Sequence, residues 1–181
     1  MKKYLFLIAL LVLVVMASGC ISNQNQTNQS STKTYSANGI SFQYPNTWNL
    51  TDTITKNATL QIESPDFQIT NGNPTKGNLV SISKDIIPQG VNLTADNITK
   101  SLSTSIKKSG VNATNETVNI AGVTAKKFSF NDTVQNATAN VWVIAFEKNN
   151  ILYILTFASV GEDLQNAKQN FETIINSFKV D

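Results

Sequence analysis

The sequence contains no histidine, no arginine and a single cysteine, Cys20. Without histidine, the chain lacks the usual general base and the commonest metal ligand, which excludes a Ser-His-Asp triad and a Cys-His pair. Without arginine, it lacks the side chain best suited to a bidentate grip on phosphate. One cysteine cannot form a disulfide within the chain, so stability must come from the core. We therefore expect a non-enzymatic protein with no catalytic residue, cofactor or metal.

Charge of either sign is also scarce. The 14 Lys oppose 12 Asp and Glu, and two of the Lys, Lys2 and Lys3, belong to the N-terminal segment. The rest of the chain is therefore balanced and offers no basic field for a polyanion. We expect no nucleic-acid partner.

The N-terminal segment has the features of an export signal. Lys2 and Lys3 precede an apolar run at 4–16, which is shorter than the roughly 20 residues of a comfortable membrane span. The small residues 17–19 then lead to Cys20, an order that resembles the lipobox of prokaryotic lipoprotein signal peptides. In that motif the cysteine becomes the lipid-bearing first residue of the mature chain. An uncleaved signal anchor over 4–21, with Cys20 as a bystander, is the alternative.

Three segments follow from this interpretation. Residues 1–19 form a lipoprotein-type signal peptide, and residues 20–34 comprise the lipidated Cys20 and a polar tether. The tether has no apolar residue from 22 to 34, so we expect it to be disordered. Residues 35–181 form one domain, which either interpretation places at the outer face of the cell membrane.

Asparagine is abundant, and ten of the 23 Asn begin an Asn-x-Ser/Thr sequon without proline. With 36 Ser and Thr in 181 residues, chance predicts about five. The candidate N-glycosylation sites are Asn25, Asn28, Asn49, Asn57, Asn92, Asn97, Asn112, Asn115, Asn131 and Asn136. We expect them in the tail, turns and loops, where a bulky glycan fits. Solvated Asn/Thr-rich loops are the alternative explanation; a lipobox with many sequons suggests an archaeal cell surface.

The folded part predicts an α+β protein. Apolar residues alternate with polar ones at 40–44, whereas 141–146 and 151–160 are apolar on both faces, so these strands belong in the middle of a covered sheet. Helical periodicity marks about 94–108 and 162–178. We expect an α/β/α sandwich with a central, mostly antiparallel sheet, and an exposed loop at 71–78.

The stretch "GISFQYPNTW" carries a family resemblance. Its pattern G-x-S-F-x-Y-P-x-x-W, formed by Gly39, Phe42, Tyr44, Pro45 and Trp48, resembles the PsbP-like domain superfamily, the PsbP and DcrB type of fold. The order of elements that follows is similar too. The resemblance implies a fold that mostly serves in binding or assembly, and we interpret the aromatic residues of the pattern as core residues.

The sequence thus favours a membrane-tethered extracytoplasmic lipoprotein with a non-catalytic binding or assembly domain. We expect a protein partner of the envelope to dock near Ala139–Asp181, which lacks sequons. One alternative is a small-molecule or lipid-binding envelope module with a pocket lined by Trp48 or Trp142. A hydrolytic enzyme with an unrecognised site is the second.

Overall fold

The computed structural model describes residues 31–52, 60–90, 94–134, 137–161 and 164–181. Cys20 and five of the sequon asparagines, Asn25, Asn28, Asn57, Asn92 and Asn136, lie outside these ranges. Within them, no helix is both long enough and apolar enough to cross a bilayer.

The centre of the fold is a sheet of eight described strands in which every pairing is antiparallel. Seven strands follow the order β3-β4-β6-β10-β9-β8-β7, and β5 pairs with the beginning of β6. Their bounds are β3 (Asn49–Asp52), β4 (Leu60–Glu63), β5 (Gln68–Thr70), β6 (Asn73–Ile86), β7 (Ala113–Ile120), β8 (Val123–Val134), β9 (Ala137–Lys148) and β10 (Ile151–Val160). The prediction of a mostly antiparallel sheet is confirmed.

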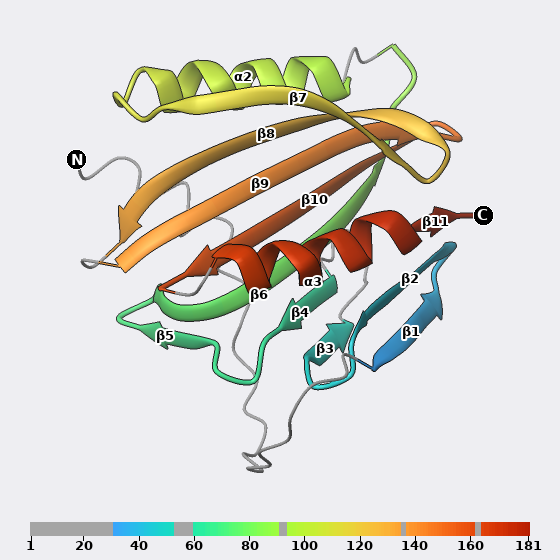
Figure 1. Cartoon of the computed structure of the whole chain (residues 1–181). Coiled ribbons are helices and arrows are strands. Elements are labelled where there is room, and N and C mark those ends of the chain that lie inside the picture. Colours follow the sequence, from blue (N-terminus) through green and yellow to red (C-terminus); the bar gives the residue numbers. More distant parts are fainter. Residues whose placement is uncertain (1–30, 53–59, 91–93, 135–136, 162–163) are drawn as a thin grey trace.

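Two helices, α2 (Ala95–Lys107) and α3 (Leu164–Ser177), cover opposite faces of this sheet (Figure 1). Both lie within the predicted ranges, which confirms the α+β class. The N-cap of α2 is Thr94, whose hydroxyl oxygen accepts a hydrogen bond from the backbone N–H of Asn97 at 3.1 Å.

Strand β9 explains why both faces of the sheet are covered. Its even-numbered residues, such as Ile144 and Phe146, join the core that contains Phe171 of α3. Val141 and Val143 point to the other face and pack in the cluster of Ile106, on α2. Because successive side chains of a strand alternate between faces, a run that is apolar throughout is stable only between two layers.

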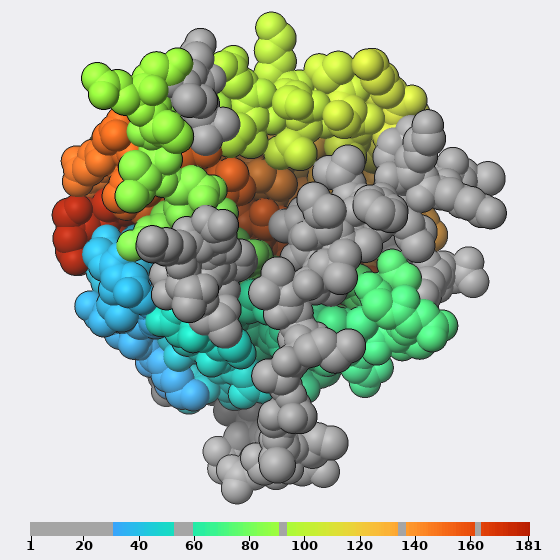
Figure 2. All heavy atoms as spheres, turned by 180° about the vertical axis from the view of Figure 1, so that it is seen from behind, coloured from blue at the N-terminus to red at the C-terminus, as the bar shows by residue number. Residues whose placement is uncertain are grey.

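A second, three-stranded sheet lies beside α3 (Figure 1). Its order is β1-β2-β11, with bounds β1 (Thr32–Ala37), β2 (Ile40–Pro45) and β11 (Lys179–Val180). Phe42 stacks on Phe178 with ring centroids 5.7 Å apart, and the backbone N–H of Gln43 donates to Ser177 Oγ at 2.8 Å. From the opposite side, Figure 2 shows these first strands, in blue and cyan, below the level of α2.

Two sequence predictions need correction. Strand β1 begins at Thr32, which pairs with Pro45, so residues 32–34 belong to the domain and not to a disordered tether. The segment predicted as an exposed loop at 71–78 is a turn at 71–72 followed by the start of β6. Asn73 and Asn78 are buried there. Nδ2 of Asn73 donates to the backbone O of Asn71, and the backbone N–H of Asn78 donates to Ser64 Oγ, whereas Oδ1 of Asn78 has no hydrogen-bond partner among the described residues. The apolar pattern of the sequence does not indicate this burial.

Candidate functional site

A polar groove of about 560 Å³ lies between α2 and the strands β7 and β8. Helix α2 turns its apolar residues, such as Ile106, toward the sheet, and its polar stripe borders the open seam beside them. The lining residues are Asp96, Asn97, Thr99, Lys100, Ser103, Thr104, Lys107, Asn115, Glu116, Lys126 and Lys127. This groove is the candidate binding site of the domain.

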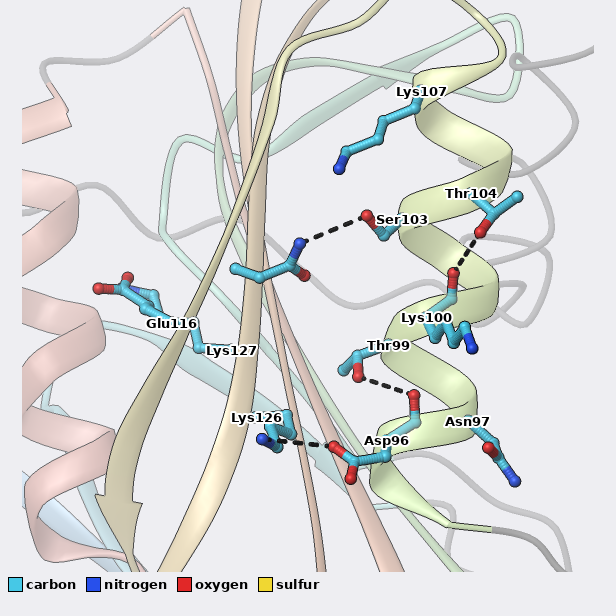
Figure 3. Close-up of a pocket in the computed structure, with 11 residues that line it drawn as sticks. Asp96, Asn97, Thr99, Lys100, Ser103, Thr104, Lys107, Glu116, Lys126 and Lys127 are labelled. Carbon is cyan, nitrogen blue, oxygen red and sulfur yellow. Dashed lines mark hydrogen bonds and ion pairs between the residues drawn. The ribbon is translucent and has the colours of Figure 1, made fainter.

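Charged side chains lie at the two ends of the groove, and an amide side chain lies between them. At one end, Lys126 of β8 forms an ion pair with Asp96 of α2 at 3.4 Å. In the middle, Asn115 of β7 donates through Nδ2 to Ser103 Oγ at 3.4 Å. Lys107 extends toward the strands at the other end (Figure 3). The walls thus offer hydroxyl, amide and ammonium groups, which suit a polar, hydroxylated or weakly anionic ligand.

The first turn of α2 does not offer a free anion site at the end of the groove. Glu147 of β9 accepts a hydrogen bond from the backbone N–H of Ala95 through Oε1 at 2.8 Å. A helix N-terminus attracts anions through such unpaired N–H groups. Here the protein's own carboxylate already takes one of them.

Lys127 and Glu116 belong to the opposite face of the sheet, although their strands border the groove. Their side chains lie on the side away from α2 (Figure 3), where they form an ion pair at 2.8 Å. The ammonium of Lys127 also lies 3.9 Å from the ring centroid of Trp142, and its side chain is only 14% exposed. Lys127 is therefore not a freely solvated surface lysine. The ring of Trp142, on the neighbouring strand β9 but distant in the sequence, holds the ammonium group.

In the part of the chain that the structure describes, no three Asp, Glu or Cys side chains lie close enough together to hold a metal. Burial raises the pKa of Glu63, Tyr35 and Tyr153, and none of these three residues lines the groove. The arrangement can bind through hydrogen bonds and charge.

The five described sequon asparagines are all exposed: Asn49, Asn97, Asn112, Asn115 and Asn131. The expectation that they lie in turns and loops is wrong for most of them. Asn49 lies in β3, Asn97 in α2, Asn115 in β7 and Asn131 in β8, whereas Asn112 directly precedes β7. Exposed polar surface, and not irregular backbone, is what these sites share.

The residues of the family pattern are structural. Gly39 occupies a left-handed turn position at φ 72°, between β1 and β2. Phe42, Tyr44, Pro45 and Trp48 are buried. Trp48 contacts Phe171 edge-on at 6.3 Å between centroids. The pattern therefore secures the N-terminal sheet against α3, as expected of core residues.

Both tryptophans pack against Phe171 in the core. Trp142 packs against Phe157 and Phe171, with centroids 6.5 and 5.5 Å away. Two further grooves, of about 490 and 350 Å³, lie at the C-terminal strand and at the start of α2. Trp48 and Trp142 line neither of these nor the groove under α2.

Only part of Ala139–Asp181, the region expected to bind a partner, is exposed on the surface. Strands β9 and β10 are interior strands of the sheet, between β6 and β8. Outside the β9–β10 turn, Gly161 and the C-terminal residues, this region exposes mainly the outward side of α3, with Gln165, Asn166, Lys168, Gln169, Glu172 and Asn176.

Taken together, the antiparallel sheet between two helices and the aromatic N-terminal hairpin define a PsbP-like α+β domain. The fold is similar to the solution structure of cyanobacterial PsbP (CyanoP) from Synechocystis sp. PCC 6803. The TM-score is 0.57 at 17% identity, over 90% of this chain and all of that one. It is also similar to LpqN, involved in cell envelope biogenesis of Mycobacterium tuberculosis, with a TM-score of 0.55 at 10% identity, over 83% of this chain and 90% of that one.

The family described as PsbP-like protein matches residues 6–180. The chain belongs to this family. A comparison with curated proteins gave no match.

Proposed function

We propose that the chain is an exported, membrane-tethered PsbP-like module that binds or supports another component of the cell envelope without catalysing a reaction. The observation that carries this proposal is the PsbP-like family match over residues 6–180, together with a groove between α2, β7 and β8 that is lined by polar and charged side chains. LpqN, a protein with this fold, is involved in cell envelope biogenesis, which agrees with an envelope role.

The anchor is the lipid on Cys20, and export exposes the sequons to N-glycosylation. The domain begins at Thr32, so 11 residues, 21–31, separate Cys20 from β1. As a random coil these would span on the order of 20 Å, which holds the domain above the bilayer. An archaeal surface is the setting in which a lipobox and many sequons occur together.

The outward side of α3 is the surface we assign to a protein partner. It lacks sequons over its whole length, and its exposed residues are mostly amides with one ion pair, Lys168 to Glu172 at 3.8 Å. The groove under α2, by contrast, is bordered by the sequons of Asn97 and Asn115. Glycans on these residues would crowd a large partner there.

Binding of a small polar ligand in the groove is the second candidate function. Lys107 and the Asn115–Ser103 pair supply donors and acceptors on two walls of one concave surface. This candidate differs from the first in the size of the ligand and in the helix that meets it.

Two matched charge reversals separate these functions. The full chain is purified from its native membrane after cross-linking, as wild type and as the variants Lys168→Glu and Lys107→Glu, each on an exposed helix surface. A partner on α3 predicts loss of the cross-linked species in Lys168→Glu only. A ligand in the groove predicts that only Lys107→Glu changes the cross-linking pattern. An unchanged cross-linking pattern in both variants contradicts the assignment of the outward side of α3 to a protein partner.

Intact mass spectrometry of the same preparation tests the anchor and the modifications. We expect cleavage before Cys20, a lipid adduct on the new N-terminus and additional glycan mass. A full-length chain without lipid overturns the lipoprotein assignment.

A further inference from the structure

Strand β7 forms one free edge of the large sheet. It pairs with β8 along all eight residues, and among the described residues no strand pairs with its other side. Four consecutive residues in its middle, 114–117, are exposed (Figure 3 views the seam between this strand and α2). Its outer N–H and C=O groups therefore face solvent in a row, which is a template for another strand.

The usual devices that protect an edge are missing from β7. The strand, ATNETVNI, contains no Pro, no Lys and no Gly, and its register with β8 runs without a bulge from Ala113 to Ile120. Its single charged residue, Glu116, is neutralised by Lys127 at 2.8 Å. A long, regular and nearly neutral edge favours pairing with a further strand.

The other described edges differ from β7. In the small sheet, β11 has only two residues, and β1 carries Lys33. Neither contains a sequon. At the far end of the large sheet, β3 has four residues, including Asp52, and a sequon at Asn49. Strand β5, which pairs only with β6, is an edge as well and has three residues. Shortness or charge protects these four edges, whereas β7 has neither.

Sequons gather where the protection is missing. Asn115 lies on β7, and Asn112 directly precedes it. Asn131 lies on β8 just past Phe130, the last residue that β7 covers, and so continues the same edge. Asn115 faces α2, where it contacts Ser103. Asn131 faces the other side, because it shares the face of Asn140 in the row of Trp142 and Ile144. Glycans here would flank the edge on both faces of the sheet.

We propose that β7 is a self-association edge, and that N-glycans at Asn112, Asn115 and Asn131 keep it unpaired. The occupant excluded by the glycans is β7 of a second copy. Antiparallel pairing of two identical strands about a twofold axis satisfies the outer groups of both at once. Chains tethered to one membrane present this strand at a similar height, which favours the encounter. The proposal rests on export and N-glycosylation, as proposed above.

The test compares the full chain in detergent micelles with and without glycans, the latter made in a host without N-glycosylation. Light scattering coupled to size-exclusion chromatography gives the protein mass, and hydrogen exchange gives the protection of 113–120. We expect a monomer with glycans. Without them we expect twice that mass and slower exchange in β7.

Two substitutions in the unglycosylated chain localise the contact. Thr117→Lys places a charge in the middle of the edge, and we expect it to restore the monomer. Gln169→Lys adds the same charge on exposed α3 and should leave the dimer intact. An unglycosylated chain that stays monomeric, or a dimer that Thr117→Lys does not alter, overturns the proposal.

Measurements on the native protein distinguish a failure of this proposal from a failure of the proposed function. Glycopeptide mass spectrometry that finds Asn112, Asn115 and Asn131 unmodified refutes their role as a shield, and with it this proposal. It leaves the lipid anchor and the partner surface on α3 standing. If only the lipid assignment fails, the difference in protein mass between the chain with glycans and the chain without them still decides this proposal.

Discussion

The hydroxyl of Tyr35 donates a hydrogen bond of 2.6 Å to Oδ2 of Asp52. Tyr35 belongs to β1 of the small sheet and Asp52 to β3, at the edge of the large sheet, so this bond joins the two sheets. Nδ2 of Asn38 donates to the same hydroxyl at 3.1 Å. Burial, together with the bond to Asp52, raises the pKa of Tyr35. The N-terminal hairpin is thereby fixed to the rest of the domain by a polar contact as well as by its aromatic core.

Replacing Tyr35 with phenylalanine should weaken this link. The ring, which stacks on Phe42 with centroids 5.2 Å apart, is kept, and only the hydroxyl is lost. We expect the free energy of unfolding to fall by about 1 kcal/mol, typical of one hydrogen bond at a partly exposed site. Urea unfolding measures it. Tyr44→Phe is the control, because its hydroxyl makes no hydrogen bond within the described part, and equal losses would contradict the role of Asp52.

Two buried serines should respond oppositely to alanine. Ser159 is fully buried, and its hydroxyl has no hydrogen-bond partner among the described residues. Ser64 accepts from the backbone N–H of Asn78 at 2.8 Å and donates to Asp66 at 2.7 Å. We expect Ser159→Ala to be neutral or to stabilise by up to about 1 kcal/mol, and Ser64→Ala to cost about 1–3 kcal/mol. Thermal unfolding of both variants checks this. A large loss in Ser159→Ala would show that the hydroxyl has a partner, such as an internal water.

Glu63 should make stability depend on pH. Burial raises its pKa, so the folded state binds its proton more tightly than the unfolded chain does. The contribution of Glu63 to the free energy of unfolding is therefore fully present below its unfolded pKa of about 4.3. It is lost as pH rises through the pKa of Glu63 in the folded state. We expect Glu63→Gln to stabilise the domain at pH 7 and to have a smaller effect at pH 4.

Urea unfolding at the two pH values measures the Glu63 effect. Glu172→Gln is a matched control on exposed α3, where an ion pair to Lys168 contributes little to stability. A benefit of Glu63→Gln that is equal at both pH values would contradict a raised pKa.

The spacing of apolar residues in the sequence was sufficient to predict those helices and strands that have a regular apolar pattern. Both helices and the two-faced strands β9 and β10 follow directly from it, and the turn at Asn149–Asn150 has the positive φ angles that asparagine tolerates. The beginning of β6 was missed, because Asn73 and Asn78 are polar and yet buried. Asn78 pairs with Ser159 of β10, which is distant in the sequence, whereas Asn73 pairs with Thr70 of the neighbouring β5. Pairing with a distant strand leaves no local trace in a sequence.

The candidate site was less accessible to prediction than the fold. The groove exists because α2 packs beside β7 and β8, which brings Asp96 to Lys126. The sequon Asn-x-Thr spaces its two polar residues by two, which suits a strand as well as a loop, and three described sequons lie in strands. Only the strand order reveals that Asn49 and Asn115 lie on edge strands and that Asn131 lies where β8 extends past β7.

Gly77 lies near the beginning of β6, where this strand closely approaches the backbone of Phe67. Its φ is 90°, and a Cβ there would lie 2.6 Å from Cα of Phe67, a backbone atom that cannot move aside. We expect Gly77→Ala to lower the free energy of unfolding by about 3 kcal/mol or more, since backbone strain and overlap act together. Gly122→Ala is the matched control: its φ is 76°, but nothing lies within 4 Å of the added methyl group. Strain alone should cost about 1–2 kcal/mol there, and equal losses in chemical denaturation would place Phe67 further from β6 than the structure does.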